Sequence, residues 1–169
     1  LGARPEIYSY GHRNPQGLAR NPQDGSIWLS EHGPQGGDEL NRLAPGLNYG
    51  WPLITYGEEY GGGKIGIGTE REGLEQPVKY YLPSIGTGGI AFYNGSRYPG
   101  WKPSLLVAAL RYTHINRVEL AGAGLGEEYR LFSDSKMRFR DVAVGPNGFV
   151  YALAGDSLVK LVPVAMAGH

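Results

Sequence analysis

The sequence predicts an all-β protein built from β-propeller-like blades, and three observations support this prediction. The composition combines 28 Gly, 12 Pro and 12 Tyr with only 2 Met. Gly and Pro interrupt helices, whereas Tyr, Val and Ile suit the pleated surface of a sheet. A pattern of short apolar strands joined by turns recurs along the chain. The pairs Asp24-Gly25 and Asn147-Gly148 separate apolar runs, which is a strong signal for a β-hairpin.

The recurring pattern defines three blade-like segments, at about residues 11–50, 84–133 and 138–163. The first contains the apolar runs GLARNP, SIWLSEHG and DELNRLAPG. The second contains GGIAFYNG, SLLVAAL and HINRVELAG, and the third contains RDVAVGP, FVYALAG and SLVKLVP. A repeat of about 40 to 50 residues is typical of propeller blades.

A complete propeller needs more chain than this. Propellers close with about four to eight blades of four strands, and the sequence supplies about three. The third segment ends after its third strand. Open blades expose unpaired backbone groups, which seek partners. We therefore expect residues 1–169 to form part of one larger propeller domain, which pairs with its missing part or self-associates.

A Gly- and Tyr-rich insertion at about residues 51–83 separates the first two segments and ends in the strand-like run EQPVKYY. Two interpretations of it remain open. It is either a structureless linker or an ordered, functional loop, since long loops in compact domains are often ordered by a ligand.

Composition excludes several classes of protein. The 16 basic and 16 acidic residues are balanced and form no basic stripe, which argues against nucleic-acid binding. The absence of Cys excludes disulfides and thiolate metal sites. No window approaches the roughly 18 apolar residues of a membrane span. The four histidines lack metal-ligand spacing, and no nucleophile elbow is present. The chain starts without Met, so we expect its true start, with any leader, to precede residue 1.

The run GHRNPQGLA contains the first candidate site. Arg13 and Asn14 precede Pro15, which favours an extended or turn geometry at Asn14. Together with Gln16 they form a dense cluster of hydrogen-bond donors, suited to a ligand rich in carbonyl or carboxylate groups. The alternative is a loop whose polar side chains satisfy their own backbone.

The run SEHGPQGGDE contains the second candidate site. Gly33-Pro34 forms a rigid turn that can direct its carbonyl groups outward, and carbonyl oxygens are ligands for a hard cation such as calcium. Asp38 and Glu39 lie nearby and could add negative charge. The alternative is an ordinary turn next to acidic residues.

The run KMRFRDV contains the third. Arg138 and Arg140 are two residues apart, so on a strand both side chains project from one face. A ligand with several carboxylates would separate the two repelling guanidinium groups. The alternative is a pair of rim arginines that form salt bridges with Asp134 and Asp141.

Taken together and in this order, these motifs resemble the soluble PQQ-dependent glucose and aldose sugar dehydrogenases. The matching runs are GHRNPQGLA, SEHGPQGGDELN, NYGWP, PSIG with the GIAFY to SLLVAAL region, and MRFRDV ahead of VGPNGFVYAL. The resemblance implies a six-bladed propeller, of which this chain is the C-terminal half. It also implies PQQ lying over the central opening, held by arginines and calcium, and a periplasmic or secreted location.

By position, the resemblance implies a role for each candidate residue. Arg13 and Asn14 would contact the quinone region of PQQ, and the carbonyls of Gly33 and Pro34 would bind calcium. Arg138 and Arg140 would pair with the carboxylates of PQQ. Arg111, in the run AALRY, stands where glucose-specific relatives carry Lys, so we expect it to bind the cofactor as well.

The reaction implied is oxidation of the anomeric hydroxyl of an aldose to a lactone. The His base of the family belongs to the N-terminal half, so this chain alone is expected to be inactive. Compared with the glucose-specific enzymes, the segment around PVKYYLP lacks their aromatic pair and has Leu82 there, so the resemblance favours a broad aldose specificity. Two alternatives remain: a non-catalytic propeller module that binds a protein or glycan, and a propeller lactonase or other metal hydrolase. The arginine set and the carbonyl-based metal signal disfavour them.

Overall fold

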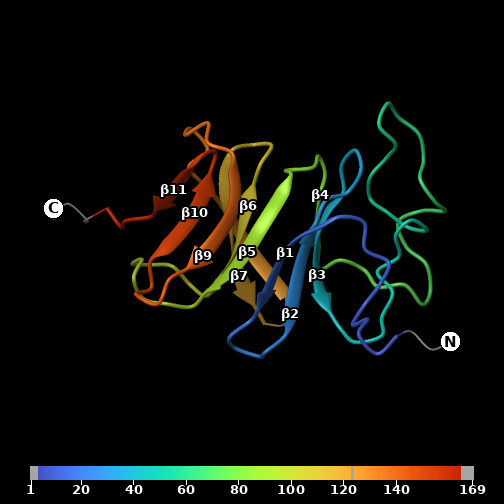
Figure 1. The fold of residues 1–169 in the computed structure, drawn as a ribbon, viewed down its shortest axis with the longest axis horizontal. Coiled ribbons are helices and arrows are strands. Elements are labelled where there is room, and N and C mark those ends of the chain that lie inside the picture. Colours follow the sequence, from blue (N-terminus) through green and yellow to red (C-terminus); the bar gives the residue numbers. More distant parts are fainter. Residues whose placement is uncertain (1–3, 123, 165–169) are drawn as a thin grey trace.

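The computed structural model describes residues 4–122 and 124–164, and they fold into three antiparallel sheets (Figure 1). These residues contain eleven strands and no helix, and therefore no helix able to cross a membrane. The strands are β1 (Pro15–Arg20), β2 (Ile27–Glu31), β3 (Asp38–Leu43), β4 (Lys79–Tyr81), β5 (Thr87–Tyr93), β6 (Ser104–Ala109), β7 (His114–Ala121), β8 (Gly124–Leu131), β9 (Phe139–Val144), β10 (Val150–Ala154) and β11 (Ser157–Lys160). The predicted all-β class is confirmed.

The first sheet has the order β1-β2-β3-β4. Asp24-Gly25 forms the turn between β1 and β2, where Gly25 has a φ of 76°. The predicted hairpin is therefore present. The fourth strand, β4, comes from the KYY end of the insertion and pairs with β3 through Asp38↔Tyr81. The first sheet thus continues into the range that the sequence assigned to the insertion.

The second sheet has the order β5-β6-β7-β8, and the third consists of β9, β10 and β11. The turn at Asn147-Gly148 joins β9 to β10, as the sequence predicts. No described strand pairs with the outer edge of β11, so the third sheet has one strand fewer than the other two.

The three sheets stand side by side, as blades of a propeller do (Figure 1). The first strand of the second sheet, β5, packs against both β1 and β9, the first strands of the neighbouring sheets. These three strands therefore form the inner ends of the blades. Residues at the start of β1, β5 and β9 are brought close together by this arrangement.

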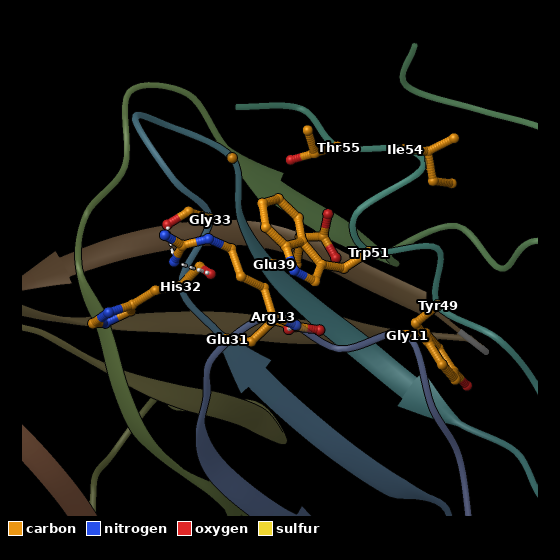
Figure 2. Close-up of a pocket in the computed structure, with 11 residues that line it drawn as sticks. Gly11, Arg13, Glu31, His32, Gly33, Glu39, Tyr49, Trp51, Ile54 and Thr55 are labelled. Atoms are coloured by element: carbon orange, nitrogen blue, oxygen red, sulfur yellow. Dashed lines mark hydrogen bonds between the residues drawn. The ribbon is translucent and has the colours of Figure 1, made fainter. Parts of the chain in front are cut away.

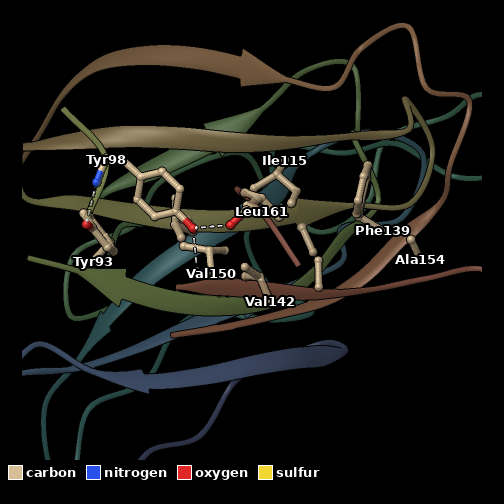
Figure 3. Packing of buried hydrophobic residues seen from close by; sticks show 11 residues of the cluster. Tyr93, Tyr98, Ile115, Phe139, Val142, Val150, Ala154 and Leu161 are labelled. Carbon is tan, nitrogen blue, oxygen red and sulfur yellow. Dashed lines mark hydrogen bonds between the residues drawn. The ribbon is translucent and has the colours of Figure 1, made fainter. Parts of the chain in front are cut away.

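Two apolar clusters lie between adjacent sheets. Figure 3 shows the one between the second and third sheets, where Phe139 and Ile115 are fully buried. Its Tyr98 hydroxyl accepts a hydrogen bond from the Val150 N–H (2.7 Å) and donates one to the Leu161 carbonyl (3.0 Å). The other cluster joins the first and second sheets and includes Trp28, which meets Phe92 edge to face.

Each of the inner strands β1, β5 and β9 contains one extra residue relative to the strand with which it pairs, and the extra residue lies close to the start of the inner strand. In β1, Gln16 has no cross-strand partner, and in β9 the unpaired residue is Arg140. In β5, Gly88 and Gly89 together lie opposite a single residue, Ala108. Such β-bulges bend a strand and re-aim its side chains, often next to functional sites.

The insertion is ordered and folds back over the Gly33-Pro34 turn. Gln35 exchanges two backbone hydrogen bonds with Glu58 (2.9 and 3.1 Å). Isolated bridges also join Ile54 to Gly68 and Glu58 to Lys64. Of the two interpretations of this segment, the structureless linker is wrong.

Candidate functional site

Arg13 lies between β1 and the turn that follows β2, and four contacts fix its position (Figure 2). Its backbone N–H donates to Glu31 Oε2 (2.6 Å). Its Nη1 donates to the carbonyls of Gly33 (2.9 Å) and His32 (3.3 Å). The guanidinium also lies over the ring of Trp51, 5.2 Å from the ring centroid. Arg13 is therefore held in place rather than free to rotate in solvent.

The carboxylate of Glu31 anchors this arrangement from the buried side. It is 3 % exposed, and its Oε1 accepts hydrogen bonds from His12 Nδ1 and Asn41 Nδ2, both at 3.0 Å. The ring of His12 stacks on Tyr49, with 4.7 Å between the centroids. Sequence reasoning did not select Glu31. Its role depends on partners 10 to 19 residues away in the chain, which only the fold brings near.

The Gly33-Pro34 turn has no room for a side chain at Gly33. A Cβ on Gly33 would collide with the carbonyl oxygens of Gly36 and Gly37. Gly36 and Gly37 in turn have φ values of 87° and 70°, which favour glycine. The turn is therefore a tight backbone loop in which carbonyl groups gather.

The two acidic residues after the turn behave differently. Asp38 is fully buried, and its carboxylate accepts the N–H of Gly33 (3.1 Å). Glu39 accepts a hydrogen bond from Asn41 Nδ2 (3.1 Å), and burial, assisted by the negative charge of Glu31, raises the pKa of Glu39 to about 7. Across residues 4–122 and 124–164, no three His, Cys, Asp or Glu side chains could hold a metal.

Arg111 lies beside the Gly33-Pro34 turn, which is called the carbonyl turn below. Together with Gly33, Pro34, Gly86 and Tyr60 it lines a hollow of about 380 Å³. The backbone N–H of Arg111 donates to the Ile85 carbonyl (2.9 Å), which holds the end of β6 against the loop between the first two sheets. The structure thus brings together Gly33, Pro34 and Arg111, which are far apart in the sequence.

Gln16 and Arg140 line a second hollow, of about 430 Å³, with Gly89 and Asp141. The Gln16 amide donates to Asn14 Oδ1 (2.9 Å) and to the Pro15 carbonyl (3.0 Å). Gln16 and Arg140 are the bulged residues of their strands, so each is directed away from regular strand pairing. This hollow lies where the three inner strands meet.

Arg138 precedes β9, and its Nε donates to the carbonyl of Leu110 at 3.4 Å, which places it close to Arg111. Arg138 and Arg140 are both exposed. Within the described part of the chain, neither arginine forms an ion pair with Asp134 or Asp141. Arg13 and Arg111 form no ion pair with any described residue either, so these four cations have no acidic partner within the described part of the chain.

Three of the four histidines are held by other groups. His32 Nε2 lies 2.6 Å from the Thr87 carbonyl, and since a carbonyl can only accept, this nitrogen carries a proton. His12 is bound to Glu31, and His114 is 1 % exposed. His169 lies outside the described residues.

The comparison with protein families decides the membership of this chain. Residues 1–162 match the model of the glucose/sorbosone dehydrogenase family. The chain belongs to this family. The predicted resemblance and the β-propeller class are thereby confirmed.

Individual relatives agree with this assignment. The chain is 45 % identical to aldose sugar dehydrogenase YliI of Escherichia coli K12 over 166 residues, which cover 97 % of this chain and 45 % of that protein. It matches a crystal structure of a glucose dehydrogenase with a TM-score of 0.92 at 48 % identity, over 97 % of this chain and 49 % of that one. The PQQ-bound form of an aldose sugar dehydrogenase from Streptomyces coelicolor matches with a TM-score of 0.65 at 33 % identity, over 86 % of this chain and 38 % of that one. The chain spans about half the length of the relatives it matches.

Proposed function

We propose that this chain is the C-terminal part of a PQQ-dependent sugar dehydrogenase that oxidises the anomeric hydroxyl of aldoses to lactones. The observation that carries the proposal is a set of four arginines that form no ion pair among the described residues. Arg13 and Arg111 lie beside a carbonyl-rich turn, and Arg138 contacts the neighbour of Arg111. Arg140 lines the hollow where the inner strands meet. The Streptomyces relative is described as PQQ-bound, which supports PQQ as the cofactor of this member too.

The turn at Gly33-Pro34 fits a calcium ion. Its donors are carbonyl oxygens, the hard ligands that calcium prefers. No hydrogen bond in the described part of the chain ends on the carbonyl of Pro34. The carbonyl of Gly33 accepts a hydrogen bond from Arg13, so calcium and Arg13 would share this group. Gly33 and Pro34 would hold the ion, and calcium would supply positive charge next to the cofactor.

The arginines fit a cofactor that carries several carboxylates. Guanidinium groups bind carboxylates through two parallel hydrogen bonds. Arg138 and Arg140 would hold these carboxylates, and Arg111 would bind the cofactor from the calcium side. Arg13, held over the turn by its bonds to the His32 and Gly33 carbonyls, would contact the quinone region. Asn14 and Gln16 are exposed next to it and supply amide groups.

PQQ supplies the redox chemistry of such an enzyme by accepting hydride from the sugar. The residues of this chain bind the cofactor, orient it and stabilise negative charge on it. None of the described histidines is placed as a free base, which is consistent with a base in the other half of the enzyme. We therefore expect no sugar oxidation by this chain alone.

The substrate and surroundings follow from the same proposal. Leu82 is 63 % exposed and would touch a side chain placed at Gly36, so it lies beside the carbonyl turn. An aliphatic side chain there favours a broad range of aldoses. The unpaired edge of β11, with Leu158 69 % exposed, would be covered by the remaining blades of the full-length protein. A periplasmic or secreted location fits this assignment.

The decisive experiment titrates PQQ, with calcium present, into the full-length protein and its Arg140→Ala variant. Losing a charge-assisted hydrogen bond costs about 1.5–3 kcal/mol, so binding should weaken by about 10- to 100-fold. Arg140→Lys should recover part of the loss, because Lys lacks the two-pronged geometry. Arg71→Ala, in the exposed part of the insertion, serves as the control. Unchanged affinity in Arg140→Ala would contradict the proposal.

A further inference from the structure

Asp38, the first residue of β3, connects two loops that are distant in the sequence. Its side chain is completely buried, and both of its oxygens accept hydrogen bonds. Oδ1 accepts the N–H of Gly33 (3.1 Å) and the hydroxyl of Ser84. Oδ2 accepts the N–H groups of Gly86 (2.6 Å) and Thr87 (3.0 Å). Four donors thus satisfy one buried carboxylate, as burial of a charge requires.

Three of the donors belong to the two loops that border the hollow beside the carbonyl turn, and the fourth, Thr87, is the first residue of β5. Gly33 starts that turn, while Gly86 lies in the connection between the first and second sheets. The same connection holds the end of β6: Leu110 N–H donates to the Gly86 carbonyl (2.8 Å), next to Arg111. The relative position of the Gly33 carbonyl and of Arg111 therefore depends on a chain of hydrogen bonds that passes through Asp38.

No basic side chain pairs with Asp38 among the described residues, so no ion pair could replace these hydrogen bonds. Asp38 is among the residues that line the hollow. Its two oxygens already accept four hydrogen bonds, from three backbone N–H groups and Ser84, so the carboxylate is not a free ligand. If it were neutralised, buried backbone N–H groups would lose a charged acceptor, and the loops would relax.

We propose that Asp38 is a positioning residue that fixes the carbonyl turn relative to Arg111, and thereby sets the affinity of the turn for calcium without touching the ion. This inference rests on the proposed function. It goes beyond it by assigning control of the cation site to a carboxylate that contributes no ligand atom. The amide of Asp38→Asn presents an N–H pair where the backbone donors need an acceptor, which would move Gly33 away from Arg111.

The test compares calcium binding to the full-length protein and to Asp38→Asn, by calorimetric titration of Ca²⁺ with PQQ saturating. We expect calcium affinity to fall by about 10- to 100-fold in Asp38→Asn. Circular dichroism shows whether the variant remains folded. Asp134→Asn, an exposed carboxylate outside both loops, is the matched control and should bind calcium as the parent does.

Ser84→Ala keeps the test decisive if Asp38→Asn does not fold. It removes one of the four donors and should weaken calcium binding by a few-fold in a folded protein. Unaltered calcium affinity in folded Asp38→Asn, or in Ser84→Ala when Asp38→Asn does not fold, overturns this inference alone. A parent that binds neither calcium nor PQQ overturns the proposed function as well.

Discussion

The two junctions between adjacent sheets are built differently, although each includes an apolar cluster. At the inner end of the first junction, hydrogen bonds run directly between sheets: Ser30 Oγ donates to the Gly88 carbonyl (2.7 Å) and His32 Nε2 to the Thr87 carbonyl (2.6 Å). Asp38 adds further bonds to the same loop. At the second junction, apolar side chains around Phe139 fill the space, and the Tyr98 hydroxyl adds hydrogen bonds to Val150 and Leu161 of the third sheet.

This difference matches the positions of the two junctions relative to the candidate site. The first junction lies between the carbonyl turn and Arg111. Because hydrogen bonds are directional, they hold the two sheets together and also fix the distance between them. The second junction holds the third sheet mainly by burial of apolar side chains, which is less directional, and the Tyr98 hydroxyl adds hydrogen bonds. We therefore expect damage at the second junction to reduce stability and damage at the first to alter the site.

The largest expected effect is at the second junction. Phe139→Ala removes a fully buried ring from the apolar cluster and should lower the free energy of unfolding of the full-length protein by about 3–5 kcal/mol. Chemical denaturation measures this loss. The neighbouring Phe132 is 44 % exposed, so Phe132→Ala should cost far less. Equal losses in the two variants would show that the cluster does not hold this junction.

The next effect depends on pH and arises in the first sheet. Burial raises the pKa of Glu39 from 4.5 to about 7, so between these values the folded state binds more protons than the unfolded state. The free energy of unfolding is therefore highest below the unfolded pKa of 4.5. It falls by about 3 kcal/mol in total as the pH rises through the folded pKa.

Glu39→Gln should remove this loss. Denaturation at about pH 4 should give similar stabilities for the parent and the variant, and at about pH 8.5 the variant should be more stable by up to about 3 kcal/mol. Glu72→Gln, at an exposed position, is the control. Parallel pH profiles for Glu39→Gln and the parent would contradict the assignment of this carboxyl.

The smallest effect comes from crowding the first junction. A Cβ on Gly17 would lie 2.7 Å from Ser30 Oγ and 2.8 Å from the backbone N of Ile90. Gly17→Ala should therefore cost about 1–3 kcal/mol of stability and also shift the affinity for PQQ. At Gly124 the nearest atom, the Ala121 carbonyl oxygen, is 3.9 Å away, so Gly124→Ala should be nearly neutral. A neutral Gly17→Ala would mean that the two sheets separate easily.

Local features of the fold could be predicted from the sequence because they depend on neighbouring residues. Asp24-Gly25 and Asn147-Gly148 specify their hairpins through the backbone freedom of glycine. The bulges could not be predicted in this way. Strict alternation does not describe this segment, because Arg138 precedes β9 and Arg140 is unpaired in it, so that Arg140 and the adjacent Asp141 are both exposed.

The candidate site could be predicted only in part from the sequence, for the same reason. The sequence identified Arg13 and the Gly33-Pro34 turn from local composition. It did not identify Glu31 or Asp38 as organising groups, since Asp38 acts on residues 46 to 49 positions away. Such bonds follow from the way neighbouring blades meet, which no local pattern of residues encodes.

The bulge repeated in β1, β5 and β9 affects which amino-acid substitutions a protein with this fold can accept. Its unpaired positions hold an amide side chain in Gln16, bare backbone at Gly88 and Gly89, and a cation in Arg140. Because Gln16 and Arg140 have no cross-strand partner, a substitution there leaves the pairing of the remaining strand intact. The propeller can therefore acquire a new ligand by exchanging residues at its inner ends, with the register of every blade preserved.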